Sequence, residues 1–158
     1  MDFTYNIRLM QSDDLNELGS VYMRAFQDPE LKEHWSETSA QALITDWFRR
    51  QPDLAFVAES ERKLVGGFIV GIRPWWDGNH LVDGELFIDP EHQGRGLASK
   101  LIRQALTSAN EKYSPVMWET YTFRSQEFPL NWYKKLGFRE IEDWVMIRAG
   151  VLQVLESL

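Results

Sequence analysis

The sequence predicts a single α/β domain with about six to seven strands and about four helices. Segments in which apolar residues alternate with polar ones are interspersed with segments in which they recur every three or four positions. The chain has 158 residues, of which 44% are hydrophobic, so it can bury the core of one domain. We therefore expect one domain over residues 1–158, without internal repeats or linkers.

The N-terminal third is predicted to hold one strand and two helices. Residues 6–10 form the strand, and Ser12 is expected to cap the first helix. The second helix is expected over residues 39–50, where Pro52 closes it. The apolar faces of the two helices are formed by Leu15, Leu18, Tyr22 and Phe26 in the first, and by Leu43, Ile44, Trp47 and Phe48 in the second.

The middle of the chain is predicted to form three strands and a helix. The strands are expected over residues 54–58, 64–73 and 81–89, with a tight polar turn at 61–63 and a second turn at Asp77-Gly78. After Pro90 a helix is expected from Gly96 to about Lys112. Its packed positions repeat every four residues, at Leu97, Leu101, Ala105 and Ala109.

The C-terminal part is predicted to hold two more strands and a short helix. The strands are expected over residues 116–121 and 140–148, and the helix begins at Pro129 and ends before Gly137. The tail after Gly150 fits either a strand or a helix. A last strand can complete its own sheet or pair with that of a partner, which leaves a homodimer open.

Composition excludes several classes of function. Without cysteine there can be no disulfide, thiolate metal site or cysteine nucleophile. The net charge of −7 disfavours nucleic acids and anionic membranes and mildly favours a cationic substrate. No basic cluster with an apolar run opens the chain, and its longest apolar stretch, residues 64–72, is far short of the roughly 20 residues of a spanning helix. We expect a cytoplasmic protein.

Residues 93–98 connect the strand ending at Asp89 to the helix beginning near Gly96. A helix N-terminus has unpaired N–H groups and a partial positive charge, so it can bind phosphate, and glycines let the backbone come close. Arg95 can add a charged contact. The alternative is a simple strand-to-helix turn. Neither the nucleoside-triphosphate loop nor the three-glycine dinucleotide loop is present, so nucleotide hydrolysis is the weakest interpretation.

Residues 86–98 resemble motif A of the GNAT (GCN5-related) N-acetyltransferases. The family pattern, Gln/Arg-x-x-Gly-x-Gly/Ala, is filled here by Gln93, Gly96 and Ala98. Residues 131–138 resemble a second signature, in which a tyrosine, here Tyr133, precedes a Gly-Phe pair by four residues. The predicted order of elements also matches over nearly the whole chain. The resemblance implies a mixed, mostly antiparallel central sheet flanked by helices, and acetyl-coenzyme A as the acetyl donor.

The resemblance also implies where the coenzyme binds. Main-chain amides of residues 93–98 would hold its pyrophosphate, and residues 86–88 would offer backbone groups to its pantetheine arm, as if the arm were an added strand. The sequence departs from the family at Gln126, where many members have asparagine. The expected coenzyme-binding residues are Leu86, Phe87, Ile88, Gln93, Gly94, Arg95, Gly96, Leu97, Ala98, Ser99 and Asn131.

An alkyl amine has a pKa near 10.4, so only about one molecule in two thousand is the free nucleophile at neutral pH, and a base is needed. Strand alternation predicts Asp83, Glu85 and Phe87 on one face, and Val82, Gly84, Leu86 and Ile88 on the other. Glu85 matches the family position that often serves as base. Asp83 can bind the substrate ammonium or raise the pKa of Glu85. The alternative is that both carboxylates face solvent on an exposed sheet.

Three aromatic residues complete the predicted site. Tyr133 matches the family's general acid, and the alternative is a core aromatic with a hydrogen-bonded hydroxyl. Trp75 and Trp76 can form a lip that binds a cation, or can simply pack against the turn. The three histidines show no metal-ligand spacing, so no metal is expected.

The sequence thus predicts an N-acetyltransferase that acts on a primary amine of a small molecule or peptide. The expected route is direct attack in a complex of enzyme, acetyl-coenzyme A and amine. The alternative is a non-catalytic acyl-coenzyme A-binding regulatory module.

Overall fold

The computed structural model describes residues 4–27, 33–124 and 127–158. The chain divides into two compact units, residues 1–121 and 122–158. The first unit contains a sheet with helices on both faces, and the second contains two short helices and the segment that joins them.

The sheet of the first unit has five strands in the order in which they occur along the chain. Neighbouring strands are antiparallel except for the last pair, which is parallel. The predicted mixed, mostly antiparallel sheet is therefore confirmed. The strands are β1 (Asn6–Leu9), β2 (Ala55–Ser60), β3 (Lys63–Trp75), β4 (Gly78–Ile88) and β5 (Met117–Glu119).

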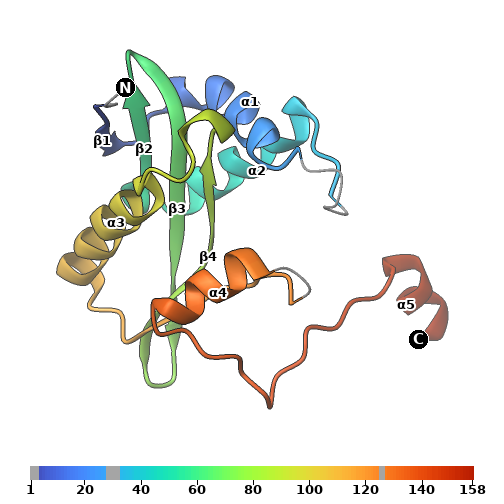
Figure 1. Cartoon of the computed structure of the whole chain (residues 1–158). Coiled ribbons are helices and arrows are strands. Elements are labelled where there is room, and N and C mark those ends of the chain that lie inside the picture. The colour runs from blue at the N-terminus through green and yellow to red at the C-terminus, as the bar shows by residue number, and fades with distance from the viewer. Residues whose placement is uncertain (1–3, 28–32, 125–126) are drawn as a thin grey trace. The chain divides into compact units, whose positions relative to one another are not determined.

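Three helices cover the sheet. α1 (Leu15–Ala25) and α2 (Glu37–Arg50) lie on one face and α3 (Leu97–Tyr113) on the other (Figure 1). Short 3₁₀ turns precede or follow them at Ser12–Asp14, Pro52–Leu54 and Pro90–His92. The core under α1 and α2 includes the fully buried Leu18, Val21, Ile44, Val57 and Ile69.

Capping explains two differences from the predicted helix boundaries. α2 begins before Ser39 because the Ser36 hydroxyl accepts a hydrogen bond from the Ser39 N–H at 3.1 Å, while the Ser39 hydroxyl accepts one from the Ser36 N–H at 3.0 Å. The expected Ser12 cap is wrong. Ser12 lies in a 3₁₀ turn, where the Asp14 carboxylate accepts a hydrogen bond from the Gln11 N–H at 2.7 Å.

A β-bulge interrupts the pairing of β3 with β4. Ile69 lies opposite Glu85 and Gly71 lies opposite Val82. Between these two pairs β4 has two residues and β3 has one. Gly84 makes the bulge possible, because its φ is +117° and a Cβ there would lie 2.0 Å from the Ile69 carbonyl oxygen. The extra residue places Val82 on the same face as Glu85. The predicted alternation is therefore wrong for Val82.

The second unit contains α4 (Glu127–Lys135) and α5 (Val151–Ser157). α4 is regular only from Pro129 onward, because Phe128 has extended backbone angles. Its end has the Schellman pattern: the Gly137 N–H donates to the Lys134 carbonyl at 3.1 Å, the Phe138 N–H donates to the Tyr133 carbonyl at 3.2 Å, and Gly137 has φ of +98°. The predicted glycine terminus is confirmed.

The strand predicted over residues 140–148 is wrong. This segment pairs with no strand in the described part of the chain, and a β-strand requires a neighbour to bond its backbone groups. The tail that follows is the helix α5, one of the two conformations left open by the sequence.

Candidate active site

The side chain of Glu85 is held on the face of β4 that α1 covers. The Tyr22 hydroxyl of α1 donates a hydrogen bond to Glu85 Oε2 at 2.9 Å, and the Tyr22 ring contacts that of Phe87 at 5.2 Å between centroids. Glu85 and Phe87 therefore share a face, as alternation predicted. Tyr22 is buried, and burial, together with the neighbouring Glu85 carboxylate, raises the pKa of its hydroxyl. The phenol remains a proton donor at neutral pH.

A second contact ties α1 to the end of β4. Arg24 donates from Nε and Nη2 to Asp89 Oδ2, at 2.9 and 2.7 Å. The other carboxylate oxygen, Asp89 Oδ1, accepts the Glu91 N–H at 3.2 Å and so caps the turn that follows the strand. Arg24 and Asp89 fix the point at which the chain leaves β4.

The outer edge of β4 is open over its last residues. β5 pairs only with residues 80–82, whereas β3 continues along the other edge of β4 as far as Ile88. From residue 83 onward no described strand lies along the outer edge of β4. An extended ligand can add to such an edge as a strand would, which fits the pantetheine arm.

The segment after β4 has the geometry of an anion-binding loop. Gly94 and Gly96 have φ of +70° and +74°, and apart from their chain neighbours no atom of the described residues lies within 4 Å of where their Cβ atoms would stand. Gly96 is the N-cap of α3, and no side chain caps that helix end. The first N–H groups of α3 therefore have no partner within the helix, and the open glycines leave room for a phosphate beside them.

Two side chains of the loop have defined places. The Gln93 side-chain amide donates to the Ile88 carbonyl at 3.0 Å and thereby ties the loop back to β4. The Arg95 guanidinium lies 3.4 Å from the Glu91 carbonyl and is exposed. Leu97 is buried and anchors the first turn of α3, whereas Ser99 is exposed on it.

A family model described as the acetyltransferase (GNAT) family matches residues 15–138. The chain belongs to this family. The matched residues include α1 with Tyr22, all of β4, the glycine loop and α4, and end at Phe138 just after α4.

Two curated relatives of this GNAT protein are N-acetyltransferases. An uncharacterized N-acetyltransferase of Methanocaldococcus jannaschii is 27% identical over 143 residues, which cover 88% of this chain and 62% of the relative. Human N-acetyltransferase 8 is 32% identical over 121 residues, or 69% of this chain and 52% of the relative. The chain thus spans about half to three fifths of the length of these relatives.

Solved structures of the same fold include two with coenzyme bound. An aminoglycoside N-acetyltransferase, AAC(6')-Iy in complex with CoA, superposes with a TM-score of 0.70 at 18% identity, over 94% of this chain and 97% of the other. An acetyltransferase of Clostridium acetobutylicum with acetyl-CoA superposes with a TM-score of 0.71 at 15% identity, over 92% and 96%. At such low identity these likenesses establish the fold alone.

Two of the predicted site residues lie in the second unit. Tyr133 sits in the last turn of α4, where its ring meets that of Phe138 edge-on at 5.1 Å. This contact is the apolar pair that accompanies a Schellman end, so the ring of Tyr133 has a structural role whether or not its hydroxyl reacts. Asn131 is exposed on the same helix. Gln126 lies outside the described residues.

The predicted tryptophan lip lies at the β3–β4 turn, far along the sheet from Glu85. Glu85 lies seven positions after Gly78 along β4, or roughly 20 Å away. Trp76 is 86% exposed, and one face of Trp75 is covered by the Arg73 guanidinium at 4.7 Å from the ring centroid. Cation binding by this lip stays a prediction. Because the lip is so far from Glu85, only a long acceptor could contact both. Asp83 lies at the bulge, and its side chain is outside the described part of the structure.

Sequence reasoning missed Tyr22 and Arg24, because it assigned the first helix only to the core. An available signal was the hydroxyl of Tyr22 within an apolar stripe, since a buried phenol requires a hydrogen-bond partner. The partner, 63 positions further along the chain, could not be identified from periodicity alone.

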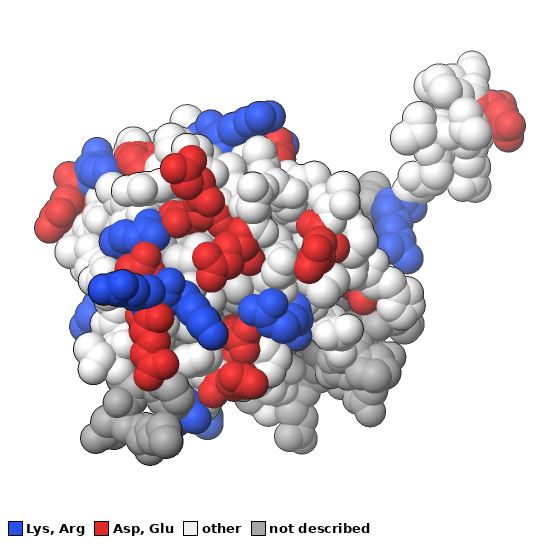
Figure 2. Space-filling view, turned by 90° about the horizontal axis from the view of Figure 1, so that it is seen from above, with Lys and Arg blue, Asp and Glu red and all other residues white. Residues whose placement is uncertain are grey.

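The surface and the remaining polar groups add little to the site. Acidic and basic side chains are interspersed on the face seen from above (Figure 2).

In residues 4–27, 33–124 and 127–158, no helix is both long and apolar enough to cross a membrane. The same residues contain no group of three or more His, Asp or Glu side chains placed to hold a metal ion.

Proposed function

We propose that this GNAT protein transfers the acetyl group of acetyl-coenzyme A to a primary amine of a small molecule or peptide. The observation that carries the proposal is the position of Glu85: a carboxylate fixed by Tyr22 on the strand whose open edge leads into the glycine loop. The names of the relatives and the coenzyme-bound neighbours support the same reaction class.

The coenzyme fits the residues of the first unit. The open edge of β4 at residues 86–88 would hold the pantetheine arm, and the backbone of residues 93–98 would hold the pyrophosphate. The absence of side chains at Gly94 and Gly96 matters most, because a Cβ at either position would stand in the space that a phosphate oxygen needs.

The reaction proceeds in a ternary complex. Acetyl-coenzyme A supplies a thioester open to nucleophilic attack. Glu85 accepts a proton from the ammonium, directly or through a water, and the freed nitrogen forms the bond to the acetyl carbon. When the carbon–sulfur bond breaks, the Tyr133 hydroxyl donates a proton to the departing thiolate. The nitrogen releases its second surplus proton to solvent as the amide forms, and the Tyr133 tyrosinate regains a proton from solvent. The hydrogen bond from Tyr22 orients the Glu85 carboxylate and favours its charged form before the proton is transferred.

The acceptor is proposed to be cationic at neutral pH. A net charge of −7 attracts such a substrate, and Asp83 and the exposed Trp76 are candidates to bind it, Trp76 only when the acceptor is long. We further propose a cytoplasmic protein, without a nucleic-acid or membrane partner, and a homodimer.

Thiol release from acetyl-coenzyme A across a panel of amines tests this function. We expect release that depends on both substrates, together with binding of coenzyme A measured by calorimetry. Binding without turnover of any amine would favour the non-catalytic acyl-coenzyme A module instead. A chain that binds no coenzyme would contradict both interpretations.

A further inference from the structure

The side chain of Trp35 connects Tyr22, which holds the proposed base, to a second carboxylate. The rings of Trp35 and Tyr22 meet edge-on, with 5.2 Å between their centroids. The indole N–H of Trp35 donates a hydrogen bond to Glu33 Oε2 at 3.0 Å, and the Tyr22 hydroxyl donates to Glu85 Oε2 at 2.9 Å. The two carboxylates are thus linked through one pair of contacting rings, which makes their separation on the order of 10 Å.

The charge of Glu33 acts on the Tyr22 hydroxyl. Burial raises the pKa of this hydroxyl most strongly, the Glu85 carboxylate raises it further, and the Glu33 carboxylate also raises it. A carboxylate has such an effect only when it lies close to the phenol, because water and salt screen a distant charge. Glu33 therefore contributes, with Glu85, to the negative potential around Tyr22.

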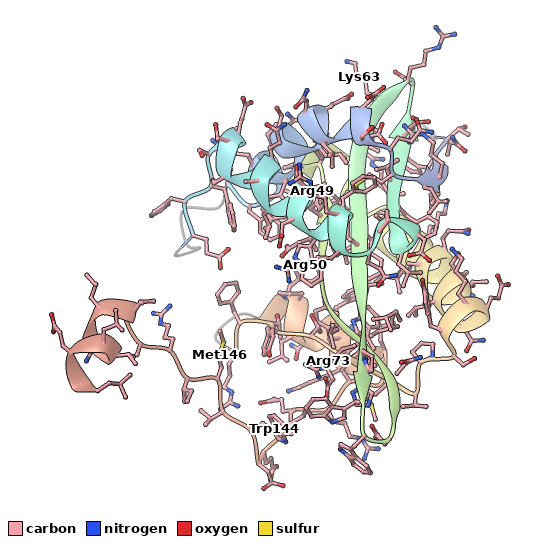
Figure 3. The ribbon with its side chains drawn as sticks, turned by 180° about the vertical axis from the view of Figure 1, so that it is seen from behind. Arg49, Arg50, Lys63, Arg73, Trp144 and Met146 are labelled. Atoms are coloured by element: carbon pink, nitrogen blue, oxygen red, sulfur yellow. The ribbon has the colours of Figure 1, made fainter. Side chains whose placement is uncertain are left out.

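No cation among the described residues neutralises Glu33. The other carboxylate that contacts α1 near the end of β4, Asp89, is paired with Arg24 at 2.7 Å. Glu33 is exposed, and its only hydrogen bond within the described residues comes from a neutral indole. Figure 3 shows the arginines of α2, Arg49 and Arg50, which belong to the last turn of that helix, roughly 20 Å along its axis from the first turn, which Glu33 precedes. Glu33 is thus available to a cation from outside the chain.

We propose that Glu33, held by Trp35, binds a second ammonium group of the acceptor, so that the enzyme prefers diamines to monoamines. This inference rests on the proposed function, because it takes Glu85 as the base for the reacting amine. The reacting nitrogen loses its proton to Glu85, while the other nitrogen keeps its protons and donates hydrogen bonds to Glu33, with the Trp35 ring beside it. A separation of this order fits a chain of about four or five methylene groups between the two nitrogens.

A series of alkyl monoamines and α,ω-diamines of matched length tests the proposal by thiol release from acetyl-coenzyme A. We expect the wild type to have the higher kcat/KM with the diamine. Glu33→Gln should lower this value by about three- to tenfold, through a higher KM at unchanged kcat, because an exposed ion pair adds only to binding. The monoamine should be unaffected, since the glutamine oxygen can still accept the Trp35 N–H and keep the ring in place.

The matched control is Glu37→Gln. Glu37 is another exposed carboxylate, four positions after Glu33, and it accepts a hydrogen bond from the Ser20 hydroxyl at 3.0 Å. Its loss removes the same charge from the same end of α2 and should change kcat/KM for neither amine. The same loss in both variants would show a general effect of net charge, and the same loss with monoamine and diamine in Glu33→Gln would show an effect through Tyr22. Either result would overturn the proposal.

Calorimetric titration of the diamine into the complex with coenzyme A separates this proposal from the proposed function. We expect weaker diamine binding by Glu33→Gln than by wild type or Glu37→Gln, and a smaller difference at high salt. An enzyme that acetylates monoamines but does not distinguish diamines would keep the proposed function and overturn this inference. If no amine is acetylated, the proposed function fails, and equal diamine binding by the three proteins would then overturn the assignment of Glu33 as well.

Discussion

A buried phenol hydroxyl requires a hydrogen-bond partner, and for Tyr22 that partner is the Glu85 carboxylate at 2.9 Å. A hydrogen bond donated to a carboxylate stabilises its charged form, so Tyr22 keeps the proposed base ready to accept a proton. Packing fixes the ring of Tyr22, which contacts Phe26, Trp35 and Phe87. The position of the Glu85 carboxylate is thus determined by the apolar core beneath it.

Tyr22→Phe should move the acidic limb of the pH–rate profile to higher pH by about one unit. The reason is that a hydrogen bond to a charged group is worth about 1.5 kcal/mol, and one pH unit corresponds to about 1.4 kcal/mol. Initial rates of thiol release between pH 5 and 9 measure the shift. The matched control is Tyr113→Phe, which removes a 2.7 Å hydrogen bond from a tyrosine to another carboxylate, Asp53. The same shift in both variants would show that Tyr22 has no special relation to the base.

Tyr133→Phe should lower turnover by about 10²–10⁴-fold if its hydroxyl is the proton donor. The ring contact with Phe138 is kept in this variant, so thermal unfolding should change little. Single-turnover rates separate this loss from weaker coenzyme binding. An unchanged rate would leave Tyr133 with only its part in the end of α4.

At the scale of elements, the loop before α3 joins a strand with an open edge to a helix without a side-chain cap. Gly94 and Gly137 form a natural pair for testing it: both have positive φ, +70° and +98°, and both have open space around the missing Cβ. Alanine at either should cost about 1–2 kcal/mol of stability, seen as a similar loss in thermal unfolding.

Only Gly94→Ala should also weaken coenzyme A binding, by about tenfold or more, because its methyl group would stand where the phosphate is proposed to bind. Calorimetric titration of both variants measures the difference. Equal affinities in the two variants would place the coenzyme phosphates elsewhere.

The bulge in β4 positions Glu85 and is itself sensitive to one residue. Gly84→Ala would place a Cβ 2.0 Å from the Ile69 carbonyl oxygen. The alanine would also have to adopt a φ of +117°, which is unfavourable for any residue with a Cβ. We expect a loss of at least about 2 kcal/mol in the free energy of unfolding by urea. Gly150→Ala, at an ordinary φ of −67° and with its Cβ 3.8 Å from the nearest side chain, should cost much less. Similar losses would mean that the bulge does not constrain β4.

Periodicity predicted the elements of the sheet and their helices because each element buries one face over many residues. The sequence also indicated where α3 begins, at Gly96, and where α4 ends, before Gly137, because glycine is the residue that most readily adopts a positive φ. The bulge was missed because it is defined by the pairing of β4 with β3. The alternation of residues within β4 alone does not show which residue is the extra one. The strand at 140–148 was wrong for a related reason: a strand depends on a neighbour that local sequence does not supply.

At the scale of the whole molecule, the first unit carries the proposed coenzyme site and base, while the second carries the proposed acid. Coenzyme recognition could be predicted from one continuous stretch of sequence, residues 86–98. The contacts of Glu85 could not, because they join residues far apart in the chain. The identity of the amine depends on residues outside both signatures, which is why one scaffold serves many acceptors.

The central claim is that Glu85 removes a proton from an amine that then takes the acetyl group. The most direct test compares wild type with Glu85→Gln in thiol release from saturating acetyl-coenzyme A, using the best alkyl amine of the panel and its fluorinated analogue of lower pKa. We predict a loss of about 10²–10⁴-fold with the alkyl amine and a much smaller loss with the analogue, which is already deprotonated. Equal rates for the two proteins, or the same loss with both amines, would contradict the role of Glu85 as base.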